Sequence, residues 1–144
     1  VLQFITLETA EQRDYTFRRT EKQWHLHQSV IRPVPEALHE FVAFYHRFVT
    51  DADYHQQHLA RNIHYTTHDP DDEMSSIDGT IDAEQWDAFC PEMPGEVLTN
   101  IDFGQSFAGA TTVYLTLCGF SNGNLEFFRF DRQNGEWLLS AYAN

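Results

Sequence analysis

Apolar, aromatic and β-branched residues gather in short runs in the C-terminal third of the chain, as is typical of β-strands with aromatic residues on both faces. Residues 113–120 and 125–130 are two β-rich runs, and a Ser-Asn-Gly-Asn segment separates them, as is typical of a hairpin. A second turn at residues 133–135 leads into a third run, residues 137–142. We predict three antiparallel strands here, with residues 96–103 as a fourth strand of the same sheet, and such a sheet needs cover on at least one face.

The middle of the chain changes to helical spacing. Pro35 suits a first helical turn, and the apolar residues that follow it recur every three or four positions. Asp51 or Asp53 can cap a second short helix that runs to about Ala60. Asp82 and Gln85 resemble the capping box of a third helix, which carries a Trp and a Phe. The apolar positions of the first helix are Leu38, Phe41, Val42, Tyr45, Phe48 and Val49.

Between the second and third helices we predict a short strand over residues 62–66 and an acidic loop over residues 68–79. The element order is then helix, helix, short strand, helix and strands. This order predicts an α+β fold in which helices pack against one face of a curved antiparallel sheet.

The first 30 residues are strand-like and precede that order. Shifted by 113 positions, they align without a gap on the C-terminal strands, with five identities in 31 positions and with matching aromatic and aliphatic sites. We interpret residues 1–32 as the tail of a preceding repeat and residues 33–144 as the domain itself. The alternative is an unrelated N-terminal hairpin of this sheet. Five residues are identical to the residue 113 positions on: Leu2, Phe17, Arg19, Trp24 and Leu26.

Composition limits the function more than the fold. The chain has 144 residues, a hydrophobic share of 42% and a formal charge of −13. Such an acidic chain repels phosphate, so we expect no nucleic acid partner, and no apolar run reaches the roughly 20 residues of a membrane span. The chain starts at Val1, so we expect either a removed targeting segment or a piece of a longer chain.

Three aromatic and turn motifs resemble an uncharacterised family of exported bacterial proteins. The motifs are Phe41-x2-Phe44-x3-Phe48-x2-Asp51-x2-Tyr54, then Ile81-Asp-Ala-Glu-Gln-Trp86-x2-Phe89, and the closing Phe128-x-Phe130-Asp-Arg-x-Asn-Gly135-Glu-Trp137-x-Leu139. The resemblance implies nuclear transport factor 2-like domains, usually in tandem, in which a curved sheet wraps around helices as a cone. It also implies a periplasmic or cell-surface location. His55 and His58 depart from the family pattern.

The cone implied by the resemblance offers a cavity, which the aromatic residues of this chain can line. We therefore expect a non-enzymatic module that binds a small apolar or sugar-like ligand or a protein partner, with no cofactor, and either a homodimer or tandem-domain packing. The alternative is a small isomerase, dehydratase or hydrolase that uses a pair such as His64 and a nearby Asp. The candidate cavity residues are Phe44, Tyr45, Tyr54, Trp86, Phe103, Phe107 and Phe128.

Two further patterns concern metals and thiols. Eleven of the 22 acidic residues lie between residues 69 and 102, and Asp69, Asp71 and Glu73 form a candidate calcium site of the looser, non-EF-hand type. His55 and His58 are spaced so that they can share a metal with a third ligand. Only two cysteines are present, and the one at position 118 lies in a run that predicts a buried strand.

Overall fold

In the computed structural model the described residues form two compact units. Val1–Ala52 and Met93–Gly109 make up the first unit, and Asp53–Glu92 and Ala110–Asn144 make up the second. The structure describes residues 1–89, 92–99, 107–119 and 123–144.

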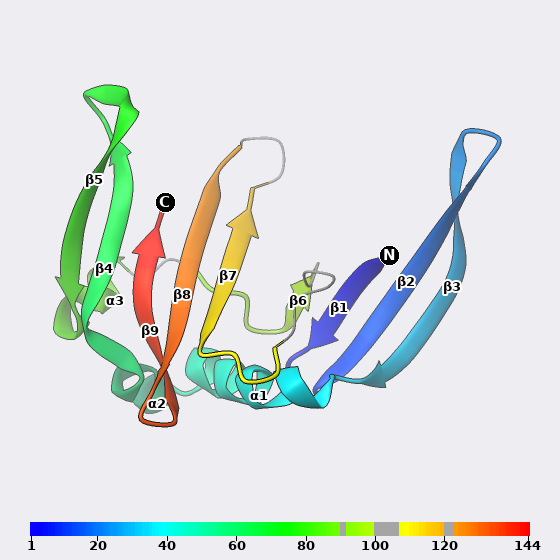
Figure 1. Ribbon diagram of the computed structural model, residues 1–144, viewed down its shortest axis with the longest axis horizontal. Coiled ribbons are helices and arrows are strands. Elements are labelled where there is room, and N and C mark those ends of the chain that lie inside the picture. The colour runs from blue at the N-terminus through cyan, green and yellow to red at the C-terminus, as the bar shows by residue number, and fades with distance from the viewer. Residues whose placement is uncertain (90–91, 100–106, 120–122) are drawn as a thin grey trace. The chain divides into compact units, whose positions relative to one another are not determined.

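The first unit contains a four-stranded sheet and a long helix (Figure 1). The strand order is β3-β2-β1-β6, and every neighbouring pair is antiparallel. The described part of the strand predicted over residues 96–103 was assigned to the wrong sheet, because β6 pairs with β1 and the Leu7 amide donates to the Glu96 carbonyl at 2.9 Å. Residues 100–103 lie outside the described residues. The strands are β1 (Leu2–Thr6), β2 (Glu11–Thr20), β3 (Gln23–Pro33) and β6 (Val97–Thr99).

The helix of the first unit, α1 (Glu36–Thr50), follows β3 directly. Pro35 is its N-cap residue with φ of −51°, and the Pro35 carbonyl accepts the first helical hydrogen bond from the Leu38 amide at 2.8 Å. The predicted helical spacing is confirmed, since the apolar side of α1 is buried. Its buried residues are Leu38, Phe41, Val42, Phe44, Tyr45 and Phe48.

The second unit is a five-stranded sheet with short helices at its chain connections (Figure 1). The strand order is β5-β4-β9-β8-β7, and β4 pairs with β9 in parallel, so the sheet is mixed. The three C-terminal strands are confirmed as a meander. The elements are α2 (Ala52–Gln57), β4 (Leu59–Asp69), β5 (Asp72–Asp82), the 3-10 turn η1 (Ala83–Gln85), α3 (Trp86–Phe89), β7 (Thr112–Cys118), β8 (Leu125–Gln133) and β9 (Glu136–Ala143).

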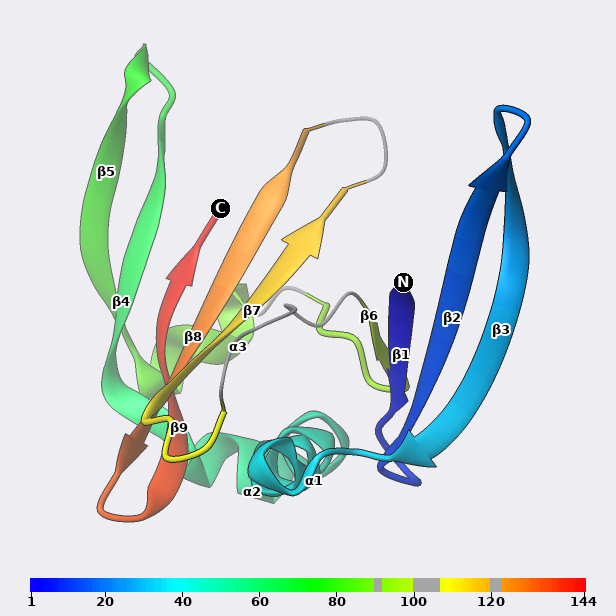
Figure 2. The ribbon, with the colours of Figure 1, turned by 45° about the vertical axis from the view of Figure 1, so that its right-hand side comes forward.

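The acidic loop predicted over residues 68–79 is wrong. These residues belong to the long hairpin of β4 and β5, drawn in green in Figure 2. Asp69 forms the turn, because its carboxylate accepts the Asp71 amide at 2.9 Å and the Ser75 hydroxyl at 3.1 Å. The short strand predicted over residues 62–66 is accordingly part of an 11-residue strand.

Two local predictions are also corrected. The capping box at Asp82 is wrong, because Asp82 makes no side-chain cap hydrogen bond and is followed by a single 3-10 turn. Cys118 is an exposed free thiol and not a core residue. Side chains alternate between the two faces of β7, and Val113, an odd number of positions from Cys118, lies on the buried face. Cys90 lies outside the described residues.

Candidate functional site

Five aromatic rings of the second unit form one connected group, which we call the Tyr142 cluster. Tyr142 on β9 stacks on Tyr65 of β4 at 5.9 Å between ring centroids and meets Trp86 of α3 edge-on at 5.7 Å. Phe128 of β8 lies 5.1 Å from Tyr142. Phe89 extends the group, with its ring 5.9 Å from that of Tyr65. Edge-to-face and offset ring pairs stabilise a cluster beyond the area they bury.

The Tyr142 cluster runs from the core to the surface. Trp86 and Phe128 are fully buried, Tyr142 is 5% exposed, and Phe89 is 50% exposed. Tyr65 is half-buried between these extremes. A ligand that reaches this group therefore meets the rings of Phe89 and Tyr65 first.

Polar groups mark the edge of the Tyr142 cluster. The Tyr142 hydroxyl donates to Glu126 at 3.4 Å, and the Tyr65 hydroxyl donates to the side-chain oxygen of Asn144 at 3.4 Å. Burial, with the added charge of Glu126, raises the pKa of Tyr142 to about 12, so its phenol stays neutral at physiological pH. Both donor–acceptor distances, 3.4 Å, are long for a hydrogen bond between oxygen atoms, and groups held so weakly can exchange partners.

Two histidines next to the Tyr142 cluster have a structural role. The indole N–H of Trp86 donates a hydrogen bond to the Nε2 atom of His55 at 3.1 Å, which holds the orientation of the Trp86 ring. His58 is buried, stacks on Tyr54 at 3.7 Å, and has its Nδ1 atom 2.8 Å from the Tyr54 carbonyl. The hydrogen bond to His55 connects α2 to α3, and the contacts of His58 are with Tyr54 of α2.

The predicted cavity residues divide between the two units. Tyr54, Trp86 and Phe128 lie in the second unit, in or beside the Tyr142 cluster. Phe44 and Tyr45 lie on α1 in the first unit, where Phe44 contacts Phe41 and Phe48. The remaining two candidates are Phe107, which is half-buried, and Phe103, which lies outside the described residues.

Tyr45 has the chemistry of a core residue. Its side chain is fully buried, and its hydroxyl donates to the Pro94 carbonyl at 3.0 Å. Burial raises the pKa of Tyr45 well above its usual range, so the phenol remains a neutral hydrogen-bond donor. The contact joins α1 to the segment before β6.

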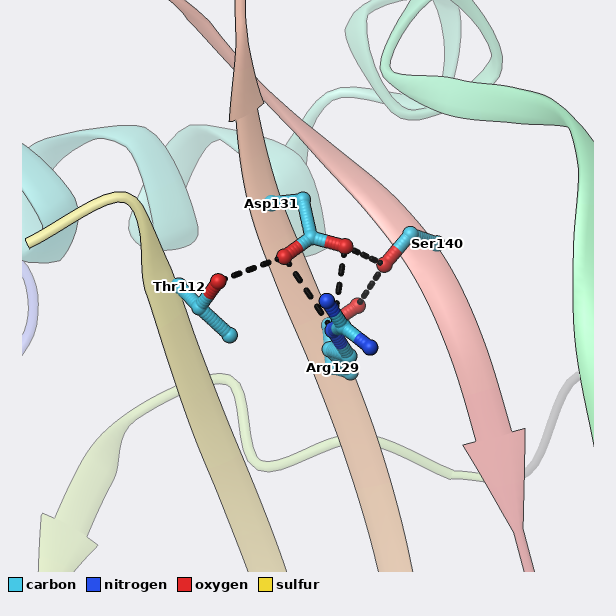
Figure 3. A network of polar contacts seen from close by, with 4 residues as sticks. All are labelled: Thr112, Arg129, Asp131 and Ser140. Carbon is cyan, nitrogen blue, oxygen red and sulfur yellow. Dashed lines mark hydrogen bonds and ion pairs between the residues drawn. The ribbon is translucent and has the colours of Figure 1, made fainter.

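A polar network lies on the opposite side of β8 from Phe128 (Figure 3). Asp131 accepts the hydroxyls of Thr112 and Ser140 at 2.7 Å each, and the Arg129 guanidinium lies 3.0 Å from the same carboxylate. Burial alone would raise the pKa of Asp131, but the three donors and the charge of Arg129 together lower it. The network joins three strands by side chains.

The alternative catalytic pair is exposed. His64 Nε2 lies 3.7 Å from Asp78 on the β4–β5 hairpin, and both side chains are more than half exposed. The Asp78 carboxylate accepts the Thr66 hydroxyl at 2.7 Å instead. This arrangement lacks the hydrogen bond that orients a general base.

No three His, Cys, Asp or Glu side chains gather as a metal site within the part of the chain that the structure describes. The side chain of Glu73 lies outside that part, so the calcium site at Asp69, Asp71 and Glu73 stays a prediction. Asp69 already accepts two hydrogen bonds within its turn. Over the same described residues, no helix is long and apolar enough to cross a membrane.

Sequence reasoning missed Tyr65, Phe89 and Tyr142 as site residues. Tyr65 and Tyr142 are paired across the parallel strands β4 and β9, and nothing in the local sequence indicates that pairing. Phe89 was recognised as a helical residue but not as an exposed ring. Strict alternation along β9 would place Tyr142 on the same face as Leu138. The bulge in the β8–β9 pair places it on the face of Leu139 instead, so alternation alone gives the wrong face for Tyr142.

The mixed sheet, the short helices and the long α1 together define an α+β protein with the nuclear transport factor 2-like fold. The chain is similar to the crystal structure of an NTF2-like protein from Bacteroides fragilis NCTC 9343, with a TM-score of 0.86 and 31% identity. The match covers 99% of this chain and 63% of that chain, so this chain spans less than two thirds of it. No curated protein matches.

The chain belongs to the family described as Domain of unknown function (DUF4348), which it matches over residues 1–144. The resemblance drawn from the aromatic motifs is confirmed for the fold and for a family without an assigned activity. Export and tandem domains stay predictions.

Proposed function

We propose that this chain is a non-enzymatic binding module of an exported bacterial protein, and that it takes a small apolar or sugar-like ligand at the Tyr142 cluster. The observation that carries the proposal is the gradient of exposure along the cluster, from buried Trp86 to half-exposed Phe89. A flat ring at the surface with a rigid aromatic group behind it is suited to stacking on an apolar face of a ligand.

The polar edge of the cluster supports a ligand that also carries hydroxyl groups. Glu126 and Asn144 accept from the two tyrosine hydroxyls at 3.4 Å, and each can accept from a ligand hydroxyl in addition. Binding would then replace weak internal hydrogen bonds with shorter ones. A sugar-like molecule combines both properties, since it has an apolar face and a hydroxyl rim.

The histidines favour binding over catalysis. His55 is occupied by the Trp86 indole, His58 by the Tyr54 carbonyl, and His64 is exposed on a hairpin. A catalytic His needs a positioned carboxylate or hydroxyl partner inside the site. The contacts of His55 and His58 serve packing, and His64 lies outside the Tyr142 cluster, so these residues support the binding proposal.

A titration with two probes tests the proposal: 8-anilinonaphthalene-1-sulfonate for apolar binding and p-nitrophenyl β-glucoside for sugar-like binding. The background is Trp24→Ser with Leu26→Ser, so that the exposed sheet face of the first unit does not bind the probes. Phe89→Ala should weaken binding of at least one probe by fivefold or more, because it removes the exposed ring.

Phe127→Ala is the matched control, since Phe127 is a 39% exposed aromatic residue on β8 with its side chain on the face opposite to Phe128. It should leave binding within twofold. Equal weakening by both variants, or no weakening by Phe89→Ala, would overturn the proposal.

A further inference from the structure

The sheet of the first unit has one apolar face that is exposed, which we call the hairpin face. Directly paired residues on antiparallel strands share a face, so the register of β1, β2, β3 and β6 assigns its members. Trp24 is 67% exposed, Leu26 55% and Ile31 52%. The apolar residues of the hairpin face are Leu2, Phe4, Tyr15, Phe17, Trp24, Leu26, Ile31 and Val97.

The strands β1, β2 and β3 form a meander whose residue pairs repeat those of β7, β8 and β9. Each counterpart lies 113 positions later, the same shift as in the sequence alignment. Leu2 pairs with Tyr15 as Leu115 pairs with Phe128. Arg19 pairs with Trp24 as Arg132 pairs with Trp137. The agreement extends over both hairpins of each meander.

The irregularities of the two meanders also agree. The β2–β3 register shifts between Thr16 and Phe17, and the β8–β9 register shifts between Arg129 and Phe130, which is 113 positions on. The β2–β3 turn has positive φ of 50° and 71°, and the β8–β9 turn has positive φ of 51° and 91°. A bulge and a two-residue turn with both φ positive are specific features, so their coincidence indicates a true structural repeat.

In the second unit the equivalent face is core. Phe130 and Leu139, the counterparts of Phe17 and Leu26, are fully buried, and Trp137, the counterpart of Trp24, is 5% exposed. Within that unit, Trp86 of the short helix α3 packs edge-on against Tyr142 of the same face. The hairpin face therefore has the residues and register of a face that helices cover.

The length of the solved relative leaves room for a covering segment outside the matched residues. Since 99% of these 144 residues corresponds to 63% of that chain, about 80 of its residues lie outside the match. A repeat of 113 residues of which residues 1–33 are present also lacks about 80 residues. The two lengths agree, so the additional length of the relative is enough to complete a first copy.

We propose that the hairpin face is the core face of a first nuclear transport factor 2-like copy, and that a helical segment of the same polypeptide, preceding Val1, covers it. That segment presents an apolar stripe to Trp24, Leu26 and Phe17. The contiguous apolar surface indicates that the face is covered, because monomeric proteins rarely leave such a face open, and the matching lengths favour this occupant. The proposal is independent of ligand binding at the Tyr142 cluster.

Hydroxyl-radical footprinting by mass spectrometry tests the proposal. It compares the 144-residue chain with the natural gene product that contains it. In the longer protein, Trp24 and Leu26 should be modified at least fivefold more slowly than in the short chain. Tyr114 is the matched control, because its side chain is 63% exposed and lies on the face of β7 opposite to Val113. Its rate should stay within twofold.

Two outcomes overturn the proposal. One is equal modification of Trp24 in both proteins, which includes the case of a natural chain with no upstream segment. The other is protection that appears only as protein concentration rises and follows the mass of a dimer, because the occupant is then a second copy. Trp24→Ser supplies a second readout: it should lower the unfolding temperature of the longer protein by several degrees and leave that of the short chain within one degree.

Discussion

The two meanders of this chain share one backbone plan and bury opposite faces. In β7, β8 and β9 the buried side carries Phe128 and Phe130. In β1, β2 and β3 the buried side carries Ile5 and Gln12, while Phe17, the counterpart of Phe130, is exposed. Turn and bulge set the register locally, but the packing partner decides which face becomes core.

The buried face of the first meander includes polar side chains, and Gln12 among them has a hydrogen-bond partner within the same meander. Gln12 is 2% exposed, and its amide donates to Asp14 at 2.7 Å. Asp14 in turn forms an ion pair with Arg32 at 2.6 Å. A buried amide needs such partners, whereas Phe128 and Phe130 need none. The first meander is thus adapted to burial on the face that its counterpart leaves exposed.

The sharpest test of the comparison is the pair Phe130→Ala and Phe17→Ala. Phe130→Ala should lower the free energy of unfolding by about 3–5 kcal/mol, because it leaves a cavity in the core. Phe17→Ala, at the equivalent position on the exposed face, should lower it by less than about 1 kcal/mol. Urea denaturation followed by circular dichroism measures both. A loss at Phe17 as large as that at Phe130 would mean that the hairpin face is already covered in the short chain.

The opposite faces give the reciprocal test. Ile5 is 1% exposed, and its counterpart 113 positions on is the exposed Cys118. Ile5→Ala should cost about 3 kcal/mol of unfolding free energy, and Cys118→Ala should change it by no more than about 0.5 kcal/mol. Cys118 should also react with Ellman's reagent in the folded protein. A Cys118 thiol that reacts only after unfolding would contradict its exposed position.

Elements with a strong period were predictable from the sequence. The helical spacing of Leu38, Phe41 and Tyr45 predicts α1, and the β-rich run at residues 125–130 between two turn signals predicts β8. Of the β4–β5 hairpin only residues 62–66 were predicted as a strand, because most residues from Thr67 to Thr80 are polar or acidic and show no strand alternation. Its strands depend on the turn at Asp69 and on pairing of β4 with β9, neither of which a periodicity shows.

The site was less predictable than the fold. Trp86 and Phe128 were chosen for their aromatic character, but the same criterion chose Phe44 and Tyr45 in the other unit. What brings Tyr65 to Tyr142 is a parallel strand pair between residues far apart in the chain. Long-range pairing of this kind leaves no local pattern, so composition alone cannot separate site residues from core residues.

The β-turns offer a smaller and cleaner contrast. Glu21 and Lys22 occupy the same left-handed conformation as Asn134 and Gly135. Non-glycine residues pay about 1–2 kcal/mol there, so Lys22→Gly should raise the free energy of unfolding by up to about 1 kcal/mol. Gly135→Lys should lower it by about 1–2 kcal/mol through backbone strain alone, since no atom lies within 4 Å of a Cβ built at Gly135. Thermal denaturation measures both, and shifts of the same sign would show that the two turns are not equivalent.

The smallest expected effect concerns Asp131, whose counterpart 113 positions earlier is the exposed Arg18. The folded pKa of Asp131 is lowered, since the hydrogen bonds from Ser140, Thr112 and Arg129 outweigh the opposing effect of burial. Its contribution to stability is therefore complete above the unfolded pKa of about 4 and is lost as pH falls through the lower folded pKa.

Asp131→Asn should cost about 1 kcal/mol of unfolding free energy at pH 7, because the charge-assisted hydrogen bonds weaken. The difference between the variant and the parent chain should shrink as the pH is lowered from 5 to 2. Arg18→Gln is the control and should shift the urea midpoint equally at both ends of that range. A difference between Asp131→Asn and the parent chain that stays constant with pH would mean that the carboxylate of Asp131 is not stabilised by its three donors.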